Sequence, residues 1–213
     1  MIPFPNKKYQ VIYADPPWNG LGWNNGSGKK CPALHYEVQD IEWIKSLPVK
    51  KITEDTCALF LWVTFPNLKE GLAVIDSWGF NYATCAFNWI KRNKKANSYF
   101  VGCGNYTRAN SELCLLGTKG HCQKLRKSRS VRQLCDVRIR EHSQKPLEVR
   151  GRIVELFGDL PRIELFARQK TEGWDVWGNE VCNSMEITTS KINTKPGLFP
   201  QDKINEWCKI KCS

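Results

Sequence analysis

The chain is organised around one run near its start, Tyr9-Gln10-Val11-Ile12-Tyr13-Ala14-Asp15-Pro16-Pro17-Trp18. Residues 9–14 are mostly apolar and rich in β-branched and aromatic side chains, which predicts a short buried strand. The two prolines then end the strand, because proline lacks the backbone donor that strand pairing requires. We therefore expect Asp15 at the carboxyl end of a strand, where open α/β sheets bind their ligands.

The groups that follow this strand suit a flat, amine-bearing base. Asp15 offers a carboxylate, Pro16 a backbone carbonyl that is expected to be free to face a cleft, and Trp18 a flat aromatic face. An exocyclic amine donates two hydrogen bonds, and a planar ring stacks on an indole. The alternative is a strand-ending turn, in which Asp15 accepts local backbone N–H groups and Trp18 covers the core.

Composition places the chain among ordinary globular proteins. Its 213 residues, 41% hydrophobic and 25% charged, predict one domain with a substantial core. No window approaches a membrane span and residues 1–5 are not a signal peptide, so we expect a soluble protein in the cytoplasm. Ten cysteines form no C-x-x-C pair and there are three histidines. We expect neither disulfides nor a metal, and cysteines such as Cys57 and Cys114 that act as small buried apolar residues.

The charge of the chain points to a polyanion. The net charge is +11, and residues 119–152 hold eleven Lys and Arg against three acidic residues. A second basic cluster lies at residues 91–95. We interpret both as loops or rims that contact nucleic acid, with a merely solvated surface as the alternative.

Strand and helix patterns alternate, which predicts an α/β fold with a mainly parallel sheet. Residues 92–109 and 119–143 are expected to be loops, and no G-x-G-x-x-G or Walker A pattern follows a strand. Residues 1–182 are expected to form one domain, followed by a polar basic tail, 183–213, that suits disorder, dimer contacts or nucleic-acid contacts. The expected strands are 9–14, 57–64, 82–91, 112–117, 162–168 and 174–177, and the expected helices are 39–47, 66–78, 147–157 and 202–211.

An ordered set of short motifs resembles a known family. The set resembles the D-P-P-W-type N6-adenine methyltransferases, which include bacterial and phage enzymes and the catalytic subunit of the eukaryotic messenger-RNA adenosine methyltransferase. The resemblance covers about residues 9–181. Its motifs are Asp15-Pro16-Pro17-Trp18, His35-Tyr36, Leu59-Phe60-Leu61-Trp62-Val63-Thr64, Asn105-Tyr106-Thr107-Arg108-Ala109-Asn110-Ser111-Glu112, Lys145-Pro146, Ile163-Glu164-Leu165-Phe166-Ala167-Arg168 and Gly178-Asn179-Glu180.

The resemblance implies a Rossmann-like class I methyltransferase sheet in circularly permuted order, with the catalytic strand first and the cofactor strand near the carboxyl end. It implies transfer of a methyl group from S-adenosylmethionine to adenine N6. The catalytic residues would be Asp15, Pro16, Pro17 and Trp18. Asp15 and the Pro16 carbonyl would accept the two N–H bonds of the amine and aim its lone pair, so orientation and preorganised electrostatics would supply most of the rate.

The resemblance also implies the two binding sites. Three of the residues that the resemblance assigns to these sites also have an alternative role that involves no ligand. For Tyr36 the alternative is packing in the core. For Glu112 it is a buried acid paired with an arginine, and for Lys145 it is a solvated lysine at a helix start. Gln169-Lys170-Thr171 and Glu180 depart from the messenger-RNA enzyme, which affects the expected cofactor affinity and leaves the reaction type unchanged. The cofactor residues would be Ala14, Asp15, Lys145, Phe166, Arg168, Asn179 and Glu180, and the substrate residues Trp18, Tyr36, Tyr106, Arg108, Asn110 and Glu112.

These features predict an adenine-N6 methyltransferase of nucleic acid, with DNA favoured over RNA because no appended RNA-recognition domain is visible. Target-recognition segments are confined to residues 92–109 and 119–143, which predicts a short or relaxed recognition sequence and salt-dependent phosphate contacts. The alternatives are a catalytically silent nucleic-acid-binding subunit and a basic structural protein. The chain keeps both the acid and the aromatic residue that silent subunits usually lose. A homodimer or heterodimer is possible.

Overall fold

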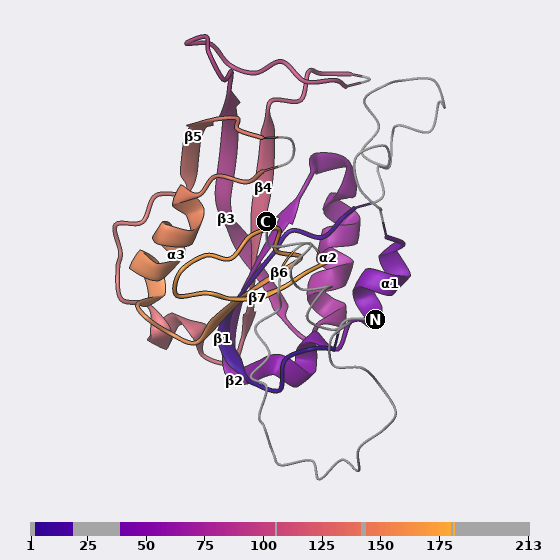
Figure 1. The fold of residues 1–213 in the computed structure, drawn as a ribbon, viewed down its shortest axis with the longest axis vertical. Helices are drawn as coiled ribbons and strands as arrows, with labels where there is room; N and C mark the ends of the chain where they lie inside the picture. Colours follow the sequence, from indigo (N-terminus) through magenta and orange to yellow (C-terminus); the bar gives the residue numbers. More distant parts are fainter. Residues whose placement is uncertain (1–2, 19–38, 105, 142–143, 180, 182–213) are drawn as a thin grey trace, which may run out of the picture.

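A computed structural model describes residues 3–18, 39–104, 106–141, 144–179 and 181, and these residues build one seven-stranded sheet (Figure 1). The strand order is β5-β3-β4-β2-β1-β6-β7. The strands are β1 (Tyr9–Ala14), β2 (Thr53–Val63), β3 (Asn81–Arg92), β4 (Ser111–Lys119), β5 (Leu134–Arg138), β6 (Arg162–Leu165) and β7 (Asp175–Trp177).

All of these strands run in one direction except β4, which is antiparallel to both β2 and β3. The first strand lies inside the sheet, between β2 and β6, and pairs in parallel with both. This arrangement confirms the α/β methyltransferase-type sheet and places the Asp15 strand directly beside the strand expected to bind the cofactor. Circular permutation relative to other methyltransferases stays a prediction.

Helices cover both faces of the sheet. Figure 1 shows α1 and α2 on one face and α3 on the other. Short 3-10 helices join the elements at Val49–Ile52, Phe65–Asn67 and Cys122–Leu125. The α-helices are α1 (Ile41–Ser46), α2 (Leu68–Ser77) and α3 (Glu148–Phe157).

Successive residues of the central strands supply two separate cores. Ile12 and Ala14 pack into the core that α1 and α2 close, whereas Val11 and Tyr13 pack into the core that α3 closes. Side chains alternate between the two faces of a strand, and helices cover both faces of this sheet. Almost every residue of β1 is therefore apolar and buried, rather than every second one. Cys57 and Cys114 are fully buried, which confirms their expected role as small apolar residues.

The expected elements differ from the observed ones in three main places, the first being β2, which begins at Thr53 and not at residue 57. The stretch 119–143 is not one long loop, because it contains a 3-10 helix and the edge strand β5. The strand expected over 162–168 ends at Leu165, because Phe166 turns the chain with a φ of +62°. The helix expected over 202–211 lies outside the described residues, as does the tail.

The direction of the strands determines which residues meet. Parallel strands end at the same edge of a sheet, and the antiparallel β4 begins at the edge where they end. Asp15 follows the end of β1, Lys91 lies near the end of β3, and Glu112 lies near the start of β4. Among the described helices, none is long and apolar enough to cross a membrane.

Candidate active site

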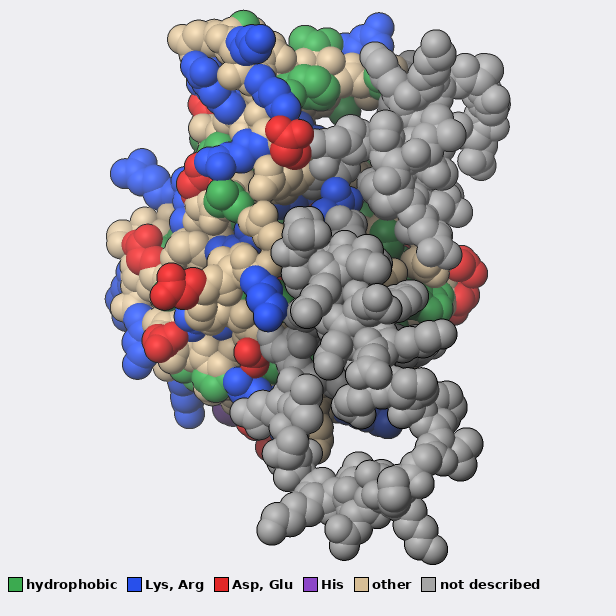
Figure 2. Space-filling model, in the orientation of Figure 1, with side chains coloured by type: hydrophobic (Ala, Val, Ile, Leu, Met, Phe, Trp, Pro, Cys, Tyr) green, Lys and Arg blue, Asp and Glu red, His purple; other side chains and the backbone are tan. Residues whose placement is uncertain are grey.

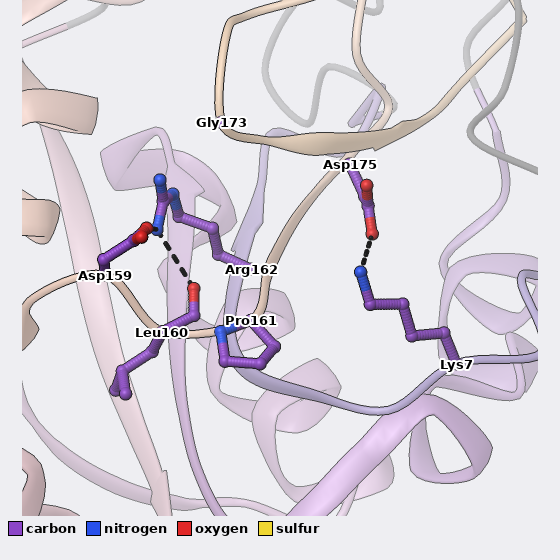
Figure 3. Close-up of a pocket in the computed structure, with 7 residues that line it drawn as sticks. All are labelled: Lys7, Asp159, Leu160, Pro161, Arg162, Gly173 and Asp175. Atoms are coloured by element: carbon purple, nitrogen blue, oxygen red, sulfur yellow. Dashed lines mark hydrogen bonds and ion pairs between the residues drawn. The ribbon is translucent and has the colours of Figure 1, made fainter.

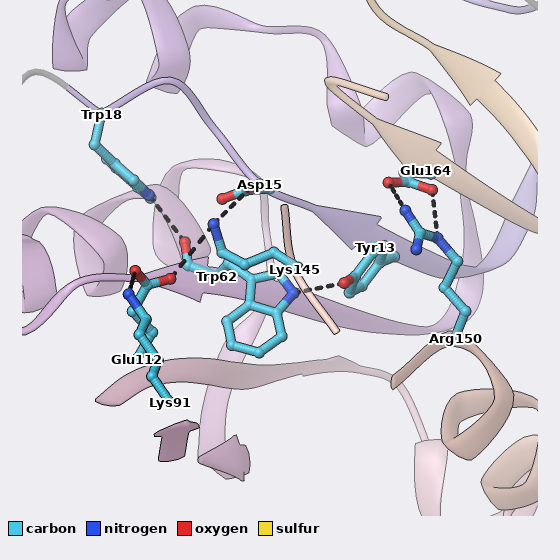
Figure 4. A network of polar contacts seen from close by, with 9 residues as sticks. All are labelled: Tyr13, Asp15, Trp18, Trp62, Lys91, Glu112, Lys145, Arg150 and Glu164. Carbon is cyan, nitrogen blue, oxygen red and sulfur yellow. Dashed lines mark hydrogen bonds and ion pairs between the residues drawn. The ribbon is translucent and has the colours of Figure 1, made fainter. Parts of the chain in front are cut away.

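Four side chains of alternating charge form a continuous chain at this edge of the sheet (Figure 4). The Lys145 ammonium lies 2.7 Å from Asp15 Oδ2 and 3.4 Å from Glu112 Oε2. Glu112 Oε1 in turn accepts a hydrogen bond of 2.5 Å from Lys91 Nζ. The four side chains are only 12% to 27% exposed, so the pairs are partly shielded from water. The chain of charges therefore joins β1, the segment before α3, β4 and β3.

Burial and charge act on the two carboxyl groups in opposite directions. Burial raises the pKa of Asp15 above the usual range, and the favourable Lys145 and Arg168 cations offset that rise only in part. Burial would also raise the pKa of Glu112, but the Lys145 and Lys91 cations outweigh it and lower that pKa. Glu112 is thus held as an anion by two cations, while Asp15 shares one close cation with it.

The turn after β1 holds its aromatic residue in the core. Trp18 is 9% exposed, and its indole N–H donates a 2.9 Å hydrogen bond to the Trp62 carbonyl of β2. Its backbone N–H donates a 2.8 Å hydrogen bond to the Pro16 carbonyl. The expectation of a free Pro16 carbonyl was therefore wrong, because the tight turn closes on it. A carbonyl oxygen has two lone pairs, so Pro16 keeps capacity for a second donor.

A second buried polar network lies behind the site. The Arg150 guanidinium pairs with both oxygens of Glu164, with Nε 2.7 Å from Oε2 and Nη2 2.5 Å from Oε1. It also lies over the Tyr13 ring, 5.3 Å from the ring centroid. The Tyr13 hydroxyl accepts a 2.7 Å hydrogen bond from the Trp62 indole N–H. Burial raises the pKa of Tyr13 well above its usual value, so this hydroxyl stays protonated.

Of the expected cofactor residues, Ala14, Asp15, Phe166, Arg168 and Asn179 lie at or just beyond the ends of β1, β6 and β7, whereas Lys145 lies before α3. Ala14 is fully buried and pairs with Leu165, the residue before Phe166. A β-carbon added at Gly178 would lie 2.3 Å from the Ala167 carbonyl oxygen, so the two chain segments cross as closely as glycine permits. Beyond this crossing, Arg168 and Asn179 are exposed, and Glu180 lies outside the described residues.

The structure brings together one expected substrate residue, Glu112, and two expected cofactor residues, Asp15 and Lys145. Glu112 is a partly buried acid on a strand and is ion-paired, as its alternative role expected, but its ion pairs within the described residues are with Lys91 and Lys145 and not with an arginine. Lys145 is paired and shielded, so its alternative as a solvated lysine was wrong. Tyr106 is fully exposed, Arg108 and Asn110 are exposed, and Tyr36 lies outside the described residues. The roles of all these residues toward ligands stay predictions.

The sequence reasoning missed the part that Lys91 plays. It placed Lys91 and Arg92 in a basic cluster facing nucleic acid, but Lys91 pairs with Glu112 and Arg92 pairs with Asp136 at 2.6 Å. A signal was present for the network behind the site, because Glu164 interrupts an apolar strand and a buried carboxylate needs a cation. No comparable signal marked Lys91, which stands among other basic residues.

A pocket of about 270 Å³ lies at the opposite edge of the sheet (Figure 3). It is lined by residues at or before the starts of strands, such as Lys7, Arg162 and Asp175, whereas Asp15 follows the end of β1. Its cations are already paired, with Lys7 2.8 Å from Asp175 and Arg162 2.6 Å from Asp159. Within the described ranges, no His, Cys, Asp and Glu residues group as a metal site would require.

Comparison with known proteins identifies relatives that align with most of the chain. The family model MT-A70 matches residues 9–180. The Type II methyltransferase M.MunI of Mycoplasma sp is 37% identical over 201 residues, which cover 87% of this chain and 83% of that protein. METTL3, an N(6)-adenosine-methyltransferase subunit, is 30% identical in Danio rerio and 29% in Homo sapiens, over 180 residues. In both cases the match covers 82% of this chain and 28% of the relative, so the chain spans little more than a quarter of these two proteins.

Proposed function

The chain belongs to the MT-A70 family, and we propose that it methylates adenine N6 in DNA with S-adenosylmethionine as the methyl donor. The observation that carries the proposal is the Asp15 carboxylate at the end of β1, held by Lys145 at the edge of the sheet where β3 also ends and β4 begins. The choice of DNA follows the Type II methyltransferase, which the chain matches along most of its length, rather than the adenosine methyltransferases.

The chemistry needs an acceptor that orients the amine. The N6 lone pair of adenine is delocalised into the ring, so the amine is a poor nucleophile until its N–H bonds are fixed in direction. We assign the first N–H to the ionised Asp15 carboxylate and the second to the remaining lone pair of the Pro16 carbonyl. Asp15 need not be a strong base, because the amine becomes acidic once it carries the new methyl group and can then release its proton.

The residues at the ends of β1, β6 and β7, together with Lys145 before α3, fit a cofactor with a carboxylate and a ribose. The Lys145 ammonium is a suitable partner for a carboxylate, and Asn179 and Arg168 present exposed polar groups beyond the close crossing at Gly178. S-adenosylmethionine would supply a methyl group on a sulfonium sulfur, which becomes a thioether when the methyl moves to nitrogen. The part of this chain is to hold the donor and acceptor in line.

The basic surface supports a polyanionic substrate. Figure 2 shows Lys and Arg side chains along the side that carries β5 and α3 and over the loop beyond β3 and β4. Lys94 and Arg140 there have acidic partners, Glu141 and Glu148. The exposed cations of the loop between β3 and β4, on the edge that carries Asp15, are the better candidates for phosphate contacts, and they are Lys95 and Arg108. The exposed cations between β4 and β5 lie at the opposite edge, beside the starts of the parallel strands.

The test is a methyl-transfer assay with labelled S-adenosylmethionine and three polymers: double-stranded DNA, single-stranded DNA and RNA. We expect label on adenine N6 of DNA, and a loss of about 10²- to 10³-fold in the Asp15→Ala variant, as for removal of one preorganised polar group from other active sites. Asp76→Ala is the matched control, because Asp76 is an exposed aspartate on α2 and its removal should leave the rate unchanged.

Two results would contradict parts of the proposal separately. Label that survives Asp15→Ala at the wild-type rate would refute the role of Asp15. Label on RNA alone would refute DNA as the substrate and leave the reaction type intact.

A further inference from the structure

Lys91 is held rigidly at the point where β3 leads into the loop that reaches Asn110. Its backbone N–H donates a 2.8 Å hydrogen bond to the Asn110 carbonyl, and its carbonyl accepts one of 2.8 Å from the Phe100 N–H. Its ammonium lies 5.0 Å from the centroid of the Trp89 ring and pairs with Glu112. The side chain is 19% exposed, so it is poorly placed to contact a phosphate from solvent.

The distances show how Lys145 is shared between two carboxylates. It lies 2.7 Å from Asp15 and 3.4 Å from Glu112, so it stands closer to Asp15. Glu112 tolerates the longer contact because its other oxygen is paired with Lys91 at 2.5 Å. A buried carboxylate that lost this second cation would attract Lys145 more strongly, since opposite charges interact strongly where water is excluded.

We infer that Lys91 is a positioning residue: by pairing with one oxygen of Glu112, it leaves Lys145 to Asp15 and so sets the orientation of the carboxylate that receives the amine. The inference rests on the proposed function only where it assigns Asp15 to the amine of the substrate. The arrangement of the four charges is a property of the ligand-free protein and can be tested without substrate. It assigns Lys91 to the active site rather than to the nucleic-acid surface.

The consequence is a change in the charge around Asp15. Lys145 and Arg168 face it as cations and Glu112 as an anion, and it also senses the more distant Arg150–Glu164 pair and the Cys114 thiol. When Lys91 is replaced by a neutral residue, Lys145 moves toward Glu112 and Asp15 loses part of its counter-charge. When Glu112 is neutralised, Lys145 is left to Asp15 alone.

The first measurement follows the Asp15 carboxyl carbon by NMR in the ligand-free protein, with the signal assigned by its absence in Asp15→Asn. We expect Lys91→Met to raise the Asp15 pKa by about one unit, and Glu112→Gln to lower it by a similar amount. In the double variant the value should follow Glu112→Gln, because Lys91 acts through Glu112. Lys7→Met, which breaks a Lys–Asp pair at the opposite edge of the sheet, should leave it unchanged.

The second measurement separates positioning from binding. In single-turnover methyl transfer, we expect Lys91→Met to lower the rate about 10- to 100-fold, as small misplacements of reacting groups do, with the Kd for DNA within about twofold of wild type. Lys91→Arg keeps the cation and should recover most of the rate. In the Glu112→Gln background, Lys91→Met should change the rate by less than about twofold.

Each contrary outcome is distinct. An unchanged Asp15 pKa in Lys91→Met overturns the inference, whatever the activity. A lower DNA affinity with a shallower salt dependence and an unchanged rate makes Lys91 a phosphate contact, which also overturns it. If the wild-type protein methylates no polymer, the proposed function fails while the titration still decides the role of Lys91. Lys91→Gln replaces Lys91→Met in both measurements if the methionine variant does not fold.

Discussion

The buried Arg150–Glu164 pair offers a sharp test of how α3 is held against the sheet. Arg150 lies on α3 and Glu164 on β6, and their side chains are 11% and 8% exposed. Arg150→Met removes the cation but keeps most of the apolar stem of the side chain. The Glu164 carboxylate is then left buried without its partner, between the helix and the sheet.

The expected loss of stability is large. Breaking a buried ion pair by removing one partner costs about 3–5 kcal/mol, because the remaining charge is uncompensated. For a chain of this size that loss lowers the Tm by about 6–20 °C. The cost is a large share of the total stability of a typical domain, about 5–15 kcal/mol.

The loss depends on pH with a definite sign. Burial raises the pKa of Glu164 above its usual value, and Arg150 limits that rise. A group with a raised pKa in the folded state favours folding at low pH, and this contribution is lost as the pH rises through the raised pKa. Without Arg150 the pKa rises further, so the difference between variant and wild type should be largest near neutral pH and shrink under acidic conditions.

Urea unfolding followed by circular dichroism at several pH values measures this difference directly. Arg150→Met/Glu164→Gln should recover part of the lost stability, because no buried charge is left unpaired. Lys7→Met is the control, since it breaks an exposed pair and should cost less than about 1 kcal/mol. A loss below about 1 kcal/mol in Arg150→Met, or one that grows toward acidic pH, would refute the reasoning.

Three further predictions follow from the same geometry. Because burial raises the pKa of Asp15 and the proposed reaction uses its ionised form, kcat/KM should fall on the acid side at a higher pH than for an ordinary aspartate; a pH–rate profile measures this. Trp18→Phe leaves a buried β2 carbonyl without its donor and should cost about 1–3 kcal/mol in urea unfolding, even if stacking on a base is retained. Gly178→Ala should lower the Tm, because its β-carbon would lie 2.3 Å from the Ala167 carbonyl oxygen, whereas Gly151→Ala, with open space in α3, should not.

Most strands and helices could be predicted from local patterns, because burial on both faces made the central strands into continuous apolar runs. The edge strand β5 could not, since Cys135 is its only fully buried residue, Val137 is only partly buried, and the other residues are exposed. The end of β6 was misplaced for a different reason. The left-handed turn at Phe166 is stabilised by packing against Trp177, a residue that is distant in sequence.

Some residues of the candidate site could likewise be located from local sequence, whereas the contacts between them could not. Asp15 could be located because strand, acid and prolines are adjacent in the chain, and the ordered motifs indicated Glu112 and Lys145. Their pairing depends on three segments that meet at one edge of the sheet. Lys91 had no distinguishing signal, because a lysine in a basic cluster looks the same whether it faces solvent or a buried carboxylate.

The sequence by itself therefore determined the class of sheet, the family and the acid expected to receive the amine, because each depends on residues close together in the chain or on their order. The tertiary structure decided which charges meet. The reversed strand β4 brings Glu112 to the edge where β1 and β3 end, and the segment before α3 carries Lys145 to the same place. Water is partly excluded at this edge, so the attraction between each pair of opposite charges is stronger than it would be in solvent. Through Asp15, the motif Asp15-Pro16-Pro17-Trp18 therefore belongs to a four-member chain of charges that ends at Lys91.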